Sequence, residues 1–387
     1  MIYISEITIN SDIDSGEVLA ALRLEKVNHQ VFFNCDFPLN KLKEEDVWNA
    51  ILIGFLPIAF ENSWNLKLNG PLDEKLLHSI KSELLPIMKM AYKTNFIPKI
   101  QCTATYKYNG QVEGEAATGL SCGVDSFATI KSKRSHLRYV SFFNVGSHGP
   151  HKTNKSLVIA NHRRENVLNA AKKIKLPLLT INSNLSDFTN QKFQDNHAFL
   201  QLACAHLLSG YCDTYYYSSG QHNDYLDKHI LDFIYINNFL VDKLSTSRLE
   251  VKSTLTNLTR AERTKSISDF KISYNHLDVC TDSYSAFRNQ AINCSKCDKC
   301  MRTQLTLDIQ KKYYLYKNVF DEDIYRDHIN LFLAKLMITQ KVDVLNAELY
   351  RLSIVDGLYT SDVYKKYLYL RWLYFKKTAK KLFKKRQ

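Results

Sequence analysis

The chain has 387 residues, a net charge of +13 and an apolar content of 45%. This length predicts two or three domains with ample chain for a buried core. The first residues lack the basic-then-apolar pattern of a secretory signal, and the longest apolar block, 50–60, is too short to span a bilayer. We therefore expect a cytoplasmic protein, neither secreted nor membrane-spanning.

The first part of the chain, residues 1–112, is expected to form a separate α+β domain. Apolar patterning predicts strands at 2–9 and 30–35 and helices at 45–60 and 71–92. Pro57 is expected to interrupt or end the first of these helices, since proline cannot donate its backbone bond. No catalytic constellation stands out here, which favours a packing or substrate-shaping role.

Residues 113–275 alternate between strand-like and helix-like segments. This alternation predicts an α/β fold with a doubly wound, mostly parallel sheet. The predicted strands are 137–143, 178–181 and 214–220, and the predicted helices are 163–174 and 198–208. Ligands bind outside the carboxyl ends of such strands. Three polar segments occupy those positions, at 121–126, 144–151 and 218–227.

The segment 118–127 reads TGLSCGVDSF, a loop of small residues that follows a β-rich run and opens a predicted helix. Unpaired N–H groups and the positive end of the helix dipole make such a loop suited to phosphate. Gly123 lets the backbone approach a ligand closely, and Asp125 could hold Mg²⁺. Ser121 and Ser126 add hydroxyl donors. An ordinary helix-capping turn is the alternative interpretation.

Residues 121–126 resemble the Ser-Gly-Gly-x-Asp-Ser pyrophosphate loop of the PP-loop ATP pyrophosphatases. The resemblance implies a PP-loop or HUP-type core that uses ATP and Mg²⁺, cleaves ATP between the α and β phosphates, and adenylates a carbonyl-type substrate. The sequence departs from the family at Cys122, where glycine is usual. Because a Cβ disfavours positive φ, we expect a negative φ at this position.

The resemblance also implies individual roles. Arg260, Arg263, Lys265 and Arg302 become candidates to neutralise phosphate charge, and a role as a solvated surface base is the alternative for each of them. Glu165 is expected to begin the helix after the second strand, and 258–263 (LTRAER) is similar to the Thr-Lys-Ala-Glu segment near the fifth strand of the family. The implied nucleotide-binding residues are Ser121, Cys122, Gly123, Val124, Asp125, Ser126, Gly146, Gly220 and Arg263, and the implied catalytic residues are Asp125 and Ser126.

Polar residues at the strand ends are further candidates for substrate contact or proton transfer. They are His148, His151, His222, Asp224 and Asp227. A plain role as polar loop residues is the alternative for each of them.

Residues 276–310 contain a cysteine cluster, Cys280, Cys294, Cys297 and Cys300. Four thiolates can enclose a tetrahedral Zn²⁺, and two-residue spacers let consecutive cysteines turn back on one ion. An iron–sulfur cluster and free or redox-active thiols are the alternatives. Such clustering without a secretory signal favours metal binding over disulfides.

The cysteine run followed by Arg302 is similar to the zinc site of the 7-cyano-7-deazaguanine synthases. That resemblance implies a ligase that forms C–N bonds, adenylating a small carbonyl or carboxylate substrate and then taking nitrogen from a donor. The chain departs from those enzymes in its additional segments, 1–112 and 311–387, and in a loose match at 220–227, where their substrate would bind. A tRNA-modifying PP-loop enzyme and a non-catalytic nucleotide sensor are the alternative functions.

The last part of the chain, 311–387, is expected to be a helical extension ending in a basic tail. Residues 361–387 hold ten Lys or Arg against one acidic residue, a net charge of +9. Apolar residues recur there at helical spacing, which predicts a basic amphipathic helix. A membrane surface or a nucleic acid would be its partner, and packing on its own protein is the alternative. A homodimer is a further expectation.

Overall fold

The computed structural model describes residues 1–110, 114–149, 151, 153–228 and 233–384, with side chains left out at 226–228, 233–235 and 377–384. The chain divides into two compact units. Unit 1 contains residues 1–121 and 125–258, and unit 2 contains 122–124 and the chain from 259 onward. Within the described residues, no helix is long and apolar enough to cross a bilayer.

Unit 1 is built on a large sheet, whose described strands run in the order β12-β11-β8-β9-β10-β3-β2-β1-β4-β6. A short pair, β5 and β7, lies beside it. The strands are β1 (Ile2–Ser11), β2 (Gly16–Leu24), β3 (Val27–Cys35), β4 (Leu66–Leu68), β5 (Leu72–Asp73), β6 (Ile100–Gln101), β7 (Thr105–Tyr106), β8 (Ala116–Gly119), β9 (Leu137–Asn144), β10 (Leu178–Ser183), β11 (Thr214–Ser218) and β12 (Glu250–Thr254).

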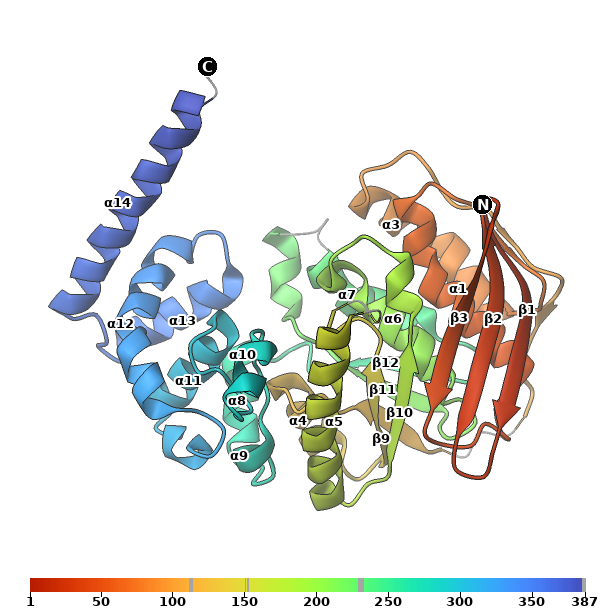
Figure 1. Cartoon of the computed structure of the whole chain (residues 1–387), viewed down its shortest axis with the longest axis horizontal. Coiled ribbons are helices and arrows are strands. Elements are labelled where there is room, and N and C mark those ends of the chain that lie inside the picture. Colours follow the sequence, from red (N-terminus) through yellow and green to blue (C-terminus); the bar gives the residue numbers. More distant parts are fainter. Residues whose placement is uncertain (111–113, 150, 152, 229–232, 385–387) are drawn as a thin grey trace. The chain divides into compact units, whose positions relative to one another are not determined.

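The five strands from β8 to β12 all pair parallel with one another. Their order places the first strand of the series in the middle, with β9 and β10 on one side and β11 and β12 on the other. Right-handed crossovers therefore put the helices before and after this reversal on opposite faces of the sheet. The expected α/β fold with a mostly parallel sheet is confirmed. The helices and helical turns of this part are α4 (Val124–Lys133), α5 (Asn154–Ile174), η2 (Leu185–Phe188), α6 (Phe193–His206), η3 (Asn223–Lys228), α7 (Phe233–Leu240) and η4 (Val241–Leu244) (Figure 1).

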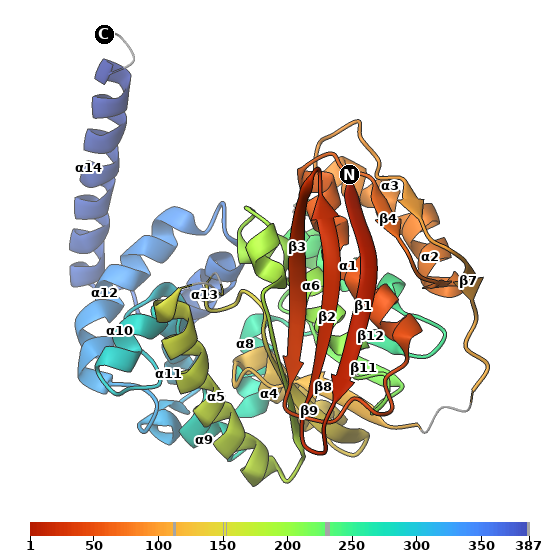
Figure 2. The same ribbon diagram turned by 45° about the vertical axis from the view of Figure 1, so that its right-hand side comes forward.

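The N-terminal strands extend the same sheet. Strand β3 pairs antiparallel with β10, with Cys35 opposite Ile181, and the hairpins β1–β2 and β2–β3 continue outward (Figure 2). Residues 1–110 thus share a sheet and an apolar core with later residues of unit 1. The main division between the two compact units falls at 258–259.

Helix α1 (Glu44–Glu61) corrects the expectation about Pro57, because the helix runs through this proline to Glu61. Nearly every residue of α1 is buried, and the helix packs against α6. Proline inside a helix costs about 3 kcal/mol. The burial of so many apolar side chains, each worth about 1.5–3 kcal/mol, exceeds that cost.

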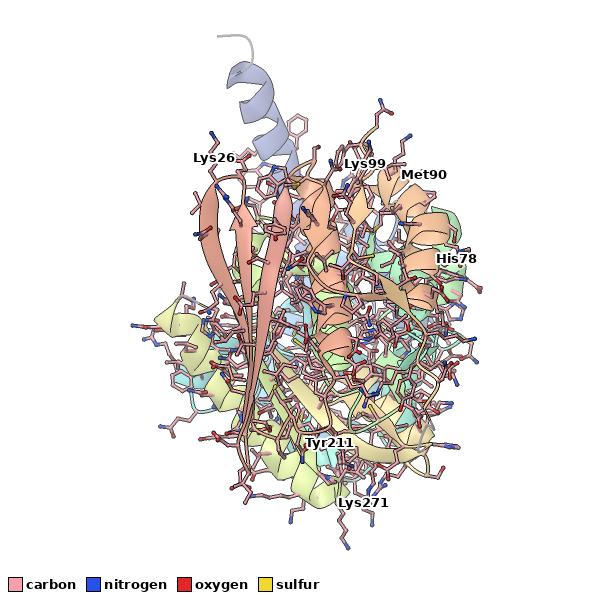
Figure 3. The ribbon with its side chains drawn as sticks, turned by 90° about the vertical axis from the view of Figure 1, so that its right-hand side faces the viewer. Lys26, His78, Met90, Lys99, Tyr211 and Lys271 are labelled. Carbon is pink, nitrogen blue, oxygen red and sulfur yellow. The ribbon has the colours of Figure 1, made fainter. Side chains whose placement is uncertain are left out.

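The helix expected at 71–92 is present in three pieces, α2 (Glu74–Ser79), a π-helical turn η1 (Ile80–Leu84) and α3 (Leu85–Ala91). The π turn directly precedes Pro86, whose missing N–H disturbs the regular ladder. In Figure 3, His78 and Met90 lie on this helical stretch at the surface of unit 1, and Tyr211 lies near the opposite end of the unit.

A buried polar network joins the start of unit 1 to its end. Asp46 and Arg248 form an ion pair in which both side chains are almost fully buried. Asp73 is fully buried and accepts hydrogen bonds from the N–H of Leu76 and, through its other oxygen, from the N–H and hydroxyl of Ser247. Because a buried charge without partners is costly, these bonds fix residues 245–248 on α1 and α2.

The regular elements in the described part of unit 2 are all helices or helical turns. Its last helix, α14, confirms the helix expected in the tail and packs against α12. Helix N-termini are capped by Thr259, Asp282, Asp321 and Asp343. The helices are α8 (Arg260–Ile267), α9 (Ser273–His276), α10 (Ser283–Arg288), α11 (Asp298–Ile309), η5 (Tyr313–Tyr316), α12 (Glu322–Thr339), α13 (Val344–Val355) and α14 (Ser361–Lys384).

Candidate functional site

The predicted phosphate loop connects β8, the strand at which the order of the parallel sheet reverses, to α4. The Ser121 hydroxyl donates a hydrogen bond to the Ser126 hydroxyl over 3.4 Å. Asp125 lies in the first turn of α4. Burial, with smaller contributions from Tyr215 and Asp125, raises the pKa of Tyr217 on the neighbouring strand β11. Ser121, Asp125 and Ser126 therefore occupy the edge of the sheet where ligands of such folds bind.

Cys122 corrects the expectation of a negative φ. Its φ is +58°, in the left-handed region, and its side chain is buried. The loop thus keeps the backbone that glycine would favour, at a cost of about 1–2 kcal/mol for a residue with a Cβ. The Cys122 carbonyl accepts a hydrogen bond of 2.9 Å from the N–H of Asp278, which holds the strained residue in place.

The other predicted nucleotide-binding residues divide between the units. Cys122, Gly123, Val124 and Arg263 belong to unit 2, and the remainder belong to unit 1. Gly146 follows β9 at a φ of +105°, and a Cβ there would lie 2.7 Å from the Ser186 Cβ, so glycine is required. Gly220 follows β11 without such a need, because a Cβ would meet open space. Arg263 is buried in α8.

A chain of polar side chains connects the carboxyl ends of β9 and β10. The Asn144 amide donates to Asn182 Oδ1 over 2.6 Å, and the Asn182 amide donates to His151 Nε2 over 3.1 Å. At the other end, His148 Nδ1 lies 3.1 Å from Asn144 Oδ1 and 3.0 Å from the Ser147 hydroxyl. Sequence reasoning singled out the two histidines but missed both asparagines, whose only signal was their position at the strand ends.

This chain of donors assigns the protonation of His148. Since Asn144 uses its amide group toward Asn182, its Oδ1 accepts, and the proton of His148 belongs on Nδ1. Burial, with a smaller contribution from Arg163, lowers the pKa of His148 to about 3. A residue that resists protonation so strongly is a weak base at neutral pH. His148 is therefore suited to accept a hydrogen bond through Nε2 and unsuited to remove a proton.

The second histidine group, after β11, contacts its own segment and the residues that follow β12. His222 Nε2 lies 3.1 Å from the Asn257 carbonyl oxygen, and its Nδ1 accepts from the N–H of Asp224. The side chain of Asp227 lies outside the described residues.

Two details of the family resemblance have purely structural explanations. Glu165 does not begin the helix after β9, because α5 starts at Asn154 and Thr153 caps it. In the segment 258–263, Thr259 and Glu262 form a capping box at the start of α8, with each side chain accepting from the other's N–H. This segment is therefore a helix start, whatever else it does.

Arg302 is engaged inside unit 2. Its guanidinium donates to Asp343 Oδ2 over 2.5 Å and to Asn346 Oδ1 over 2.9 Å. These bonds tie α11 to the start of α13, so the geometry gives Arg302 a structural role.

The four predicted metal ligands lie together at the start of α11. Their Sγ atoms all lie within 4.8 Å of one another, with 3.9 Å between Cys294 and Cys300 and 3.4 Å between Cys297 and Cys300. Four sulfurs around one Zn²⁺ at about 2.3 Å would be separated by ~3.8 Å. The cluster could therefore hold a single metal ion such as zinc, and it is more compact than the ligand set of a multi-iron cluster.

Backbone N–H groups donate hydrogen bonds to two of these sulfurs. The N–H of Cys294 donates to Cys280 Sγ over 3.4 Å, and the N–H of Cys297 donates to Cys294 Sγ over 3.3 Å. Ser295 adopts a φ of +59° between them, which makes the turn. Hydrogen bonding among the four thiols lowers the pKa of Cys294 and Cys297 and raises that of Cys280 and Cys300, so two of the four are favoured as thiolates before any cation binds. A bound cation would complete the deprotonation of all four.

Asn293 fixes the backbone next to two cysteines of the four-cysteine site. It is buried, accepts from the N–H of Val279, and donates to the carbonyls of Leu277 and Val319. Cys280 and Cys294 directly adjoin residues held in this way, so the ligands have a rigid backing. All four positions are closed by protein sulfur, which is typical of structural sites and leaves no open position for a substrate.

Comparisons with protein-family models, with curated proteins and with solved structures found no match for this chain.

Proposed function

We propose that this chain is an ATP-dependent, AMP-forming enzyme of the PP-loop type, with a structural zinc in its four-cysteine site. In this proposal the enzyme adenylates a small carbonyl or carboxylate substrate and then transfers nitrogen to it, as 7-cyano-7-deazaguanine synthases do. This proposal rests on the position of the loop 121–126, which links α4 to β8, the strand at which the order of the parallel sheet reverses. A loop of small residues at this point of a doubly wound sheet is well placed to receive a pyrophosphate.

The residues of the loop would bind and orient the nucleotide. Ser121 and Ser126 supply hydroxyl donors to phosphate oxygens, and Asp125 supplies a carboxylate oxygen for Mg²⁺. The substrate oxygen attacks the α-phosphorus, pyrophosphate leaves, and the nitrogen donor then displaces AMP from the adenylate. Positioning and charge stabilisation account for most of the rate enhancement in reactions of this kind.

The chain of side chains at the ends of β9 and β10 would contribute substrate recognition. Asn144, Asn182 and His148 in this chain are neutral donors and acceptors, which suits an uncharged polar group such as an amide. Proton removal from the attacking nitrogen must then fall to another group or to solvent.

The test is incubation of the purified protein with ATP, Mg²⁺ and a panel of small carboxylates and amides, followed by separation of the nucleotides. The proposal expects AMP and pyrophosphate, with Asp125→Asn lowering the rate about 100-fold or more. Ser132→Ala, an exposed position on the same helix α4, is the control and should retain full activity. ADP as the product would refute the α/β cleavage. ATP binding without turnover across the panel would instead indicate a nucleotide-binding protein.

A further inference from the structure

The last helix carries an apolar surface that nothing in the described part of unit 2 covers. Tyr364, Leu368, Trp372 and Phe375 are 51, 64, 51 and 76% exposed. Their spacing of four, four and three residues places them on one side of α14 as a continuous stripe, which extends ~17 Å along the helix axis. We call these four residues the α14 stripe. Isolated exposed apolar residues are ordinary, but a contiguous set of this size marks an interaction surface.

The stripe is distinct from the side of α14 that packs within unit 2. Val363 is buried, and Tyr367 and Leu370 are half-buried, at positions that lie on another side of the helix. Helix α14 is therefore held on α12 by one side while it presents the stripe with another. A partner can bind the stripe without any rearrangement of unit 2.

Basic residues border the stripe. At 100° per residue, Arg371 lies along one edge and Lys376 along the other, with the Lys376 ammonium 4.2 Å from the centre of the Trp372 ring. Residues 361–387 carry a net charge of +9. The partner must therefore combine an apolar phase with surrounding negative charge.

We propose that α14 docks this protein, in the plane of the membrane, on an anionic lipid bilayer. Trp and Tyr have apolar rings with polar tips and are enriched at the boundary between acyl chains and headgroups. Lys and Arg along the edges meet the phosphates and serine headgroups, at about 1 kcal/mol each. This arrangement of an apolar stripe with basic borders is the pattern of an interfacial amphipathic helix.

A nucleic acid fits the stripe less well. An RNA-binding surface brings Lys and Arg into the contact face and uses aromatic rings to stack on bases. Here Leu368 and Phe375 occupy the centre of the contact face, and the cations lie at its margins. The proposal is independent of the ATP chemistry proposed above, because it concerns a helix remote in sequence from the loop 121–126.

The experiment is sedimentation of the full-length protein with phosphatidylcholine vesicles, prepared with and without phosphatidylserine, at low and high salt. We expect binding to the phosphatidylserine vesicles that weakens with salt, accompanied by a blue shift of Trp372 fluorescence. Leu368→Ser with Phe375→Ser should lower the partition coefficient ~100-fold or more, since each side chain loses most of its transfer free energy. Arg371→Glu with Lys376→Glu should lower it at least about tenfold.

A matched control is Val342→Ser with Val355→Ser, which removes two apolar side chains of unit 2 that are 75 and 88% exposed outside α14. This control should bind vesicles as the unmodified chain does. Thermal unfolding of all variants should coincide, because the altered side chains are exposed. The proposal is overturned if the stripe variant binds vesicles unchanged, if the protein binds RNA but no vesicles, or if the stripe only mediates a concentration-dependent dimer.

Discussion

His206 provides a direct test of the packing of unit 1. It ends α6 with 1% of its surface exposed, and its Nε2 lies 2.8 Å from the Leu244 carbonyl oxygen, to which it donates. Burial lowers its pKa from 6.5 to about 4, against smaller opposing contributions from this hydrogen bond and from Asp73. The neutral form therefore stabilises the folded state above pH 6.5. As the pH falls from 6.5 toward 4, His206 becomes protonated in the unfolded chain but stays neutral in the folded chain. The free energy of unfolding therefore decreases.

The size of this loss follows from the two pKa values. At pH 5, a group with pKa 6.5 unfolded and about 4 folded costs about 2 kcal/mol of unfolding free energy relative to pH 7.5. His206→Gln keeps a donor for the Leu244 carbonyl and removes the titration. The stability difference between the unmodified chain and this variant should shrink by about 2 kcal/mol between pH 7.5 and pH 5.

Urea unfolding followed by tryptophan fluorescence measures this difference. Trp48 is buried in the core of unit 1 and reports its unfolding. His78→Gln, an exposed histidine of α2 visible at the surface in Figure 3, should leave the pH dependence unchanged. If His206→Gln shows the same pH slope as the unmodified chain, His206 is not buried as a neutral donor and the packing of α6 against residues 241–244 is wrong.

Three further changes have definite expected outcomes. Cys297→Ser should abolish stoichiometric zinc by atomic absorption and lower the melting temperature of unit 2, whereas Cys102→Ser, outside the cluster, should retain one zinc per chain. Asp73→Ala should cost about 3 kcal/mol in urea unfolding because it removes a helix cap and leaves buried donors unpaired, against about 1 kcal/mol for the exposed cap Asp321→Ala. Cys122→Gly should be more stable than Cys122→Ala by up to about 1 kcal/mol, since only alanine retains the positive-φ strain; equal stability would contradict the left-handed conformation.

The pattern of apolar residues in the sequence predicted several of the strands and helices. The strands at 137–143, 178–181 and 214–220 and the helix at 198–208 appear within a few residues of their expected limits, because a half-buried element must repeat its apolar positions. The four cysteines were equally predictable, since metal ligation fixes both residue type and spacing.

Other features depend on tertiary pairing and left no such signal. Strand β2, with the sequence GEVLAALRL, consists mostly of residues that favour helices, and its long pairing with β1 and β3 makes it a strand. Pro57 predicts the end of a helix, but α1 continues through it because the helix is almost entirely buried. Asn144 and Asn182 meet only because β9 and β10 are adjacent and pair Asn144 with Asn182 in register.

Hydrogen bonds connect Cys122 to the four-cysteine site within unit 2. The Cys122 carbonyl is held by the N–H of Asp278, and Cys280, two residues further along, is a predicted metal ligand. Asp278 also accepts the N–H of Cys280 through its side chain, over 3.2 Å. All three backbone N–H groups of the segment 278–280 therefore donate a hydrogen bond, that of Val279 to the Asn293 side chain. A backbone in the left-handed region persists only where its surroundings impose it. The segment 278–280, which joins Cys280 of the four-cysteine site to Asp278, supplies such a constraint on Cys122 of the loop.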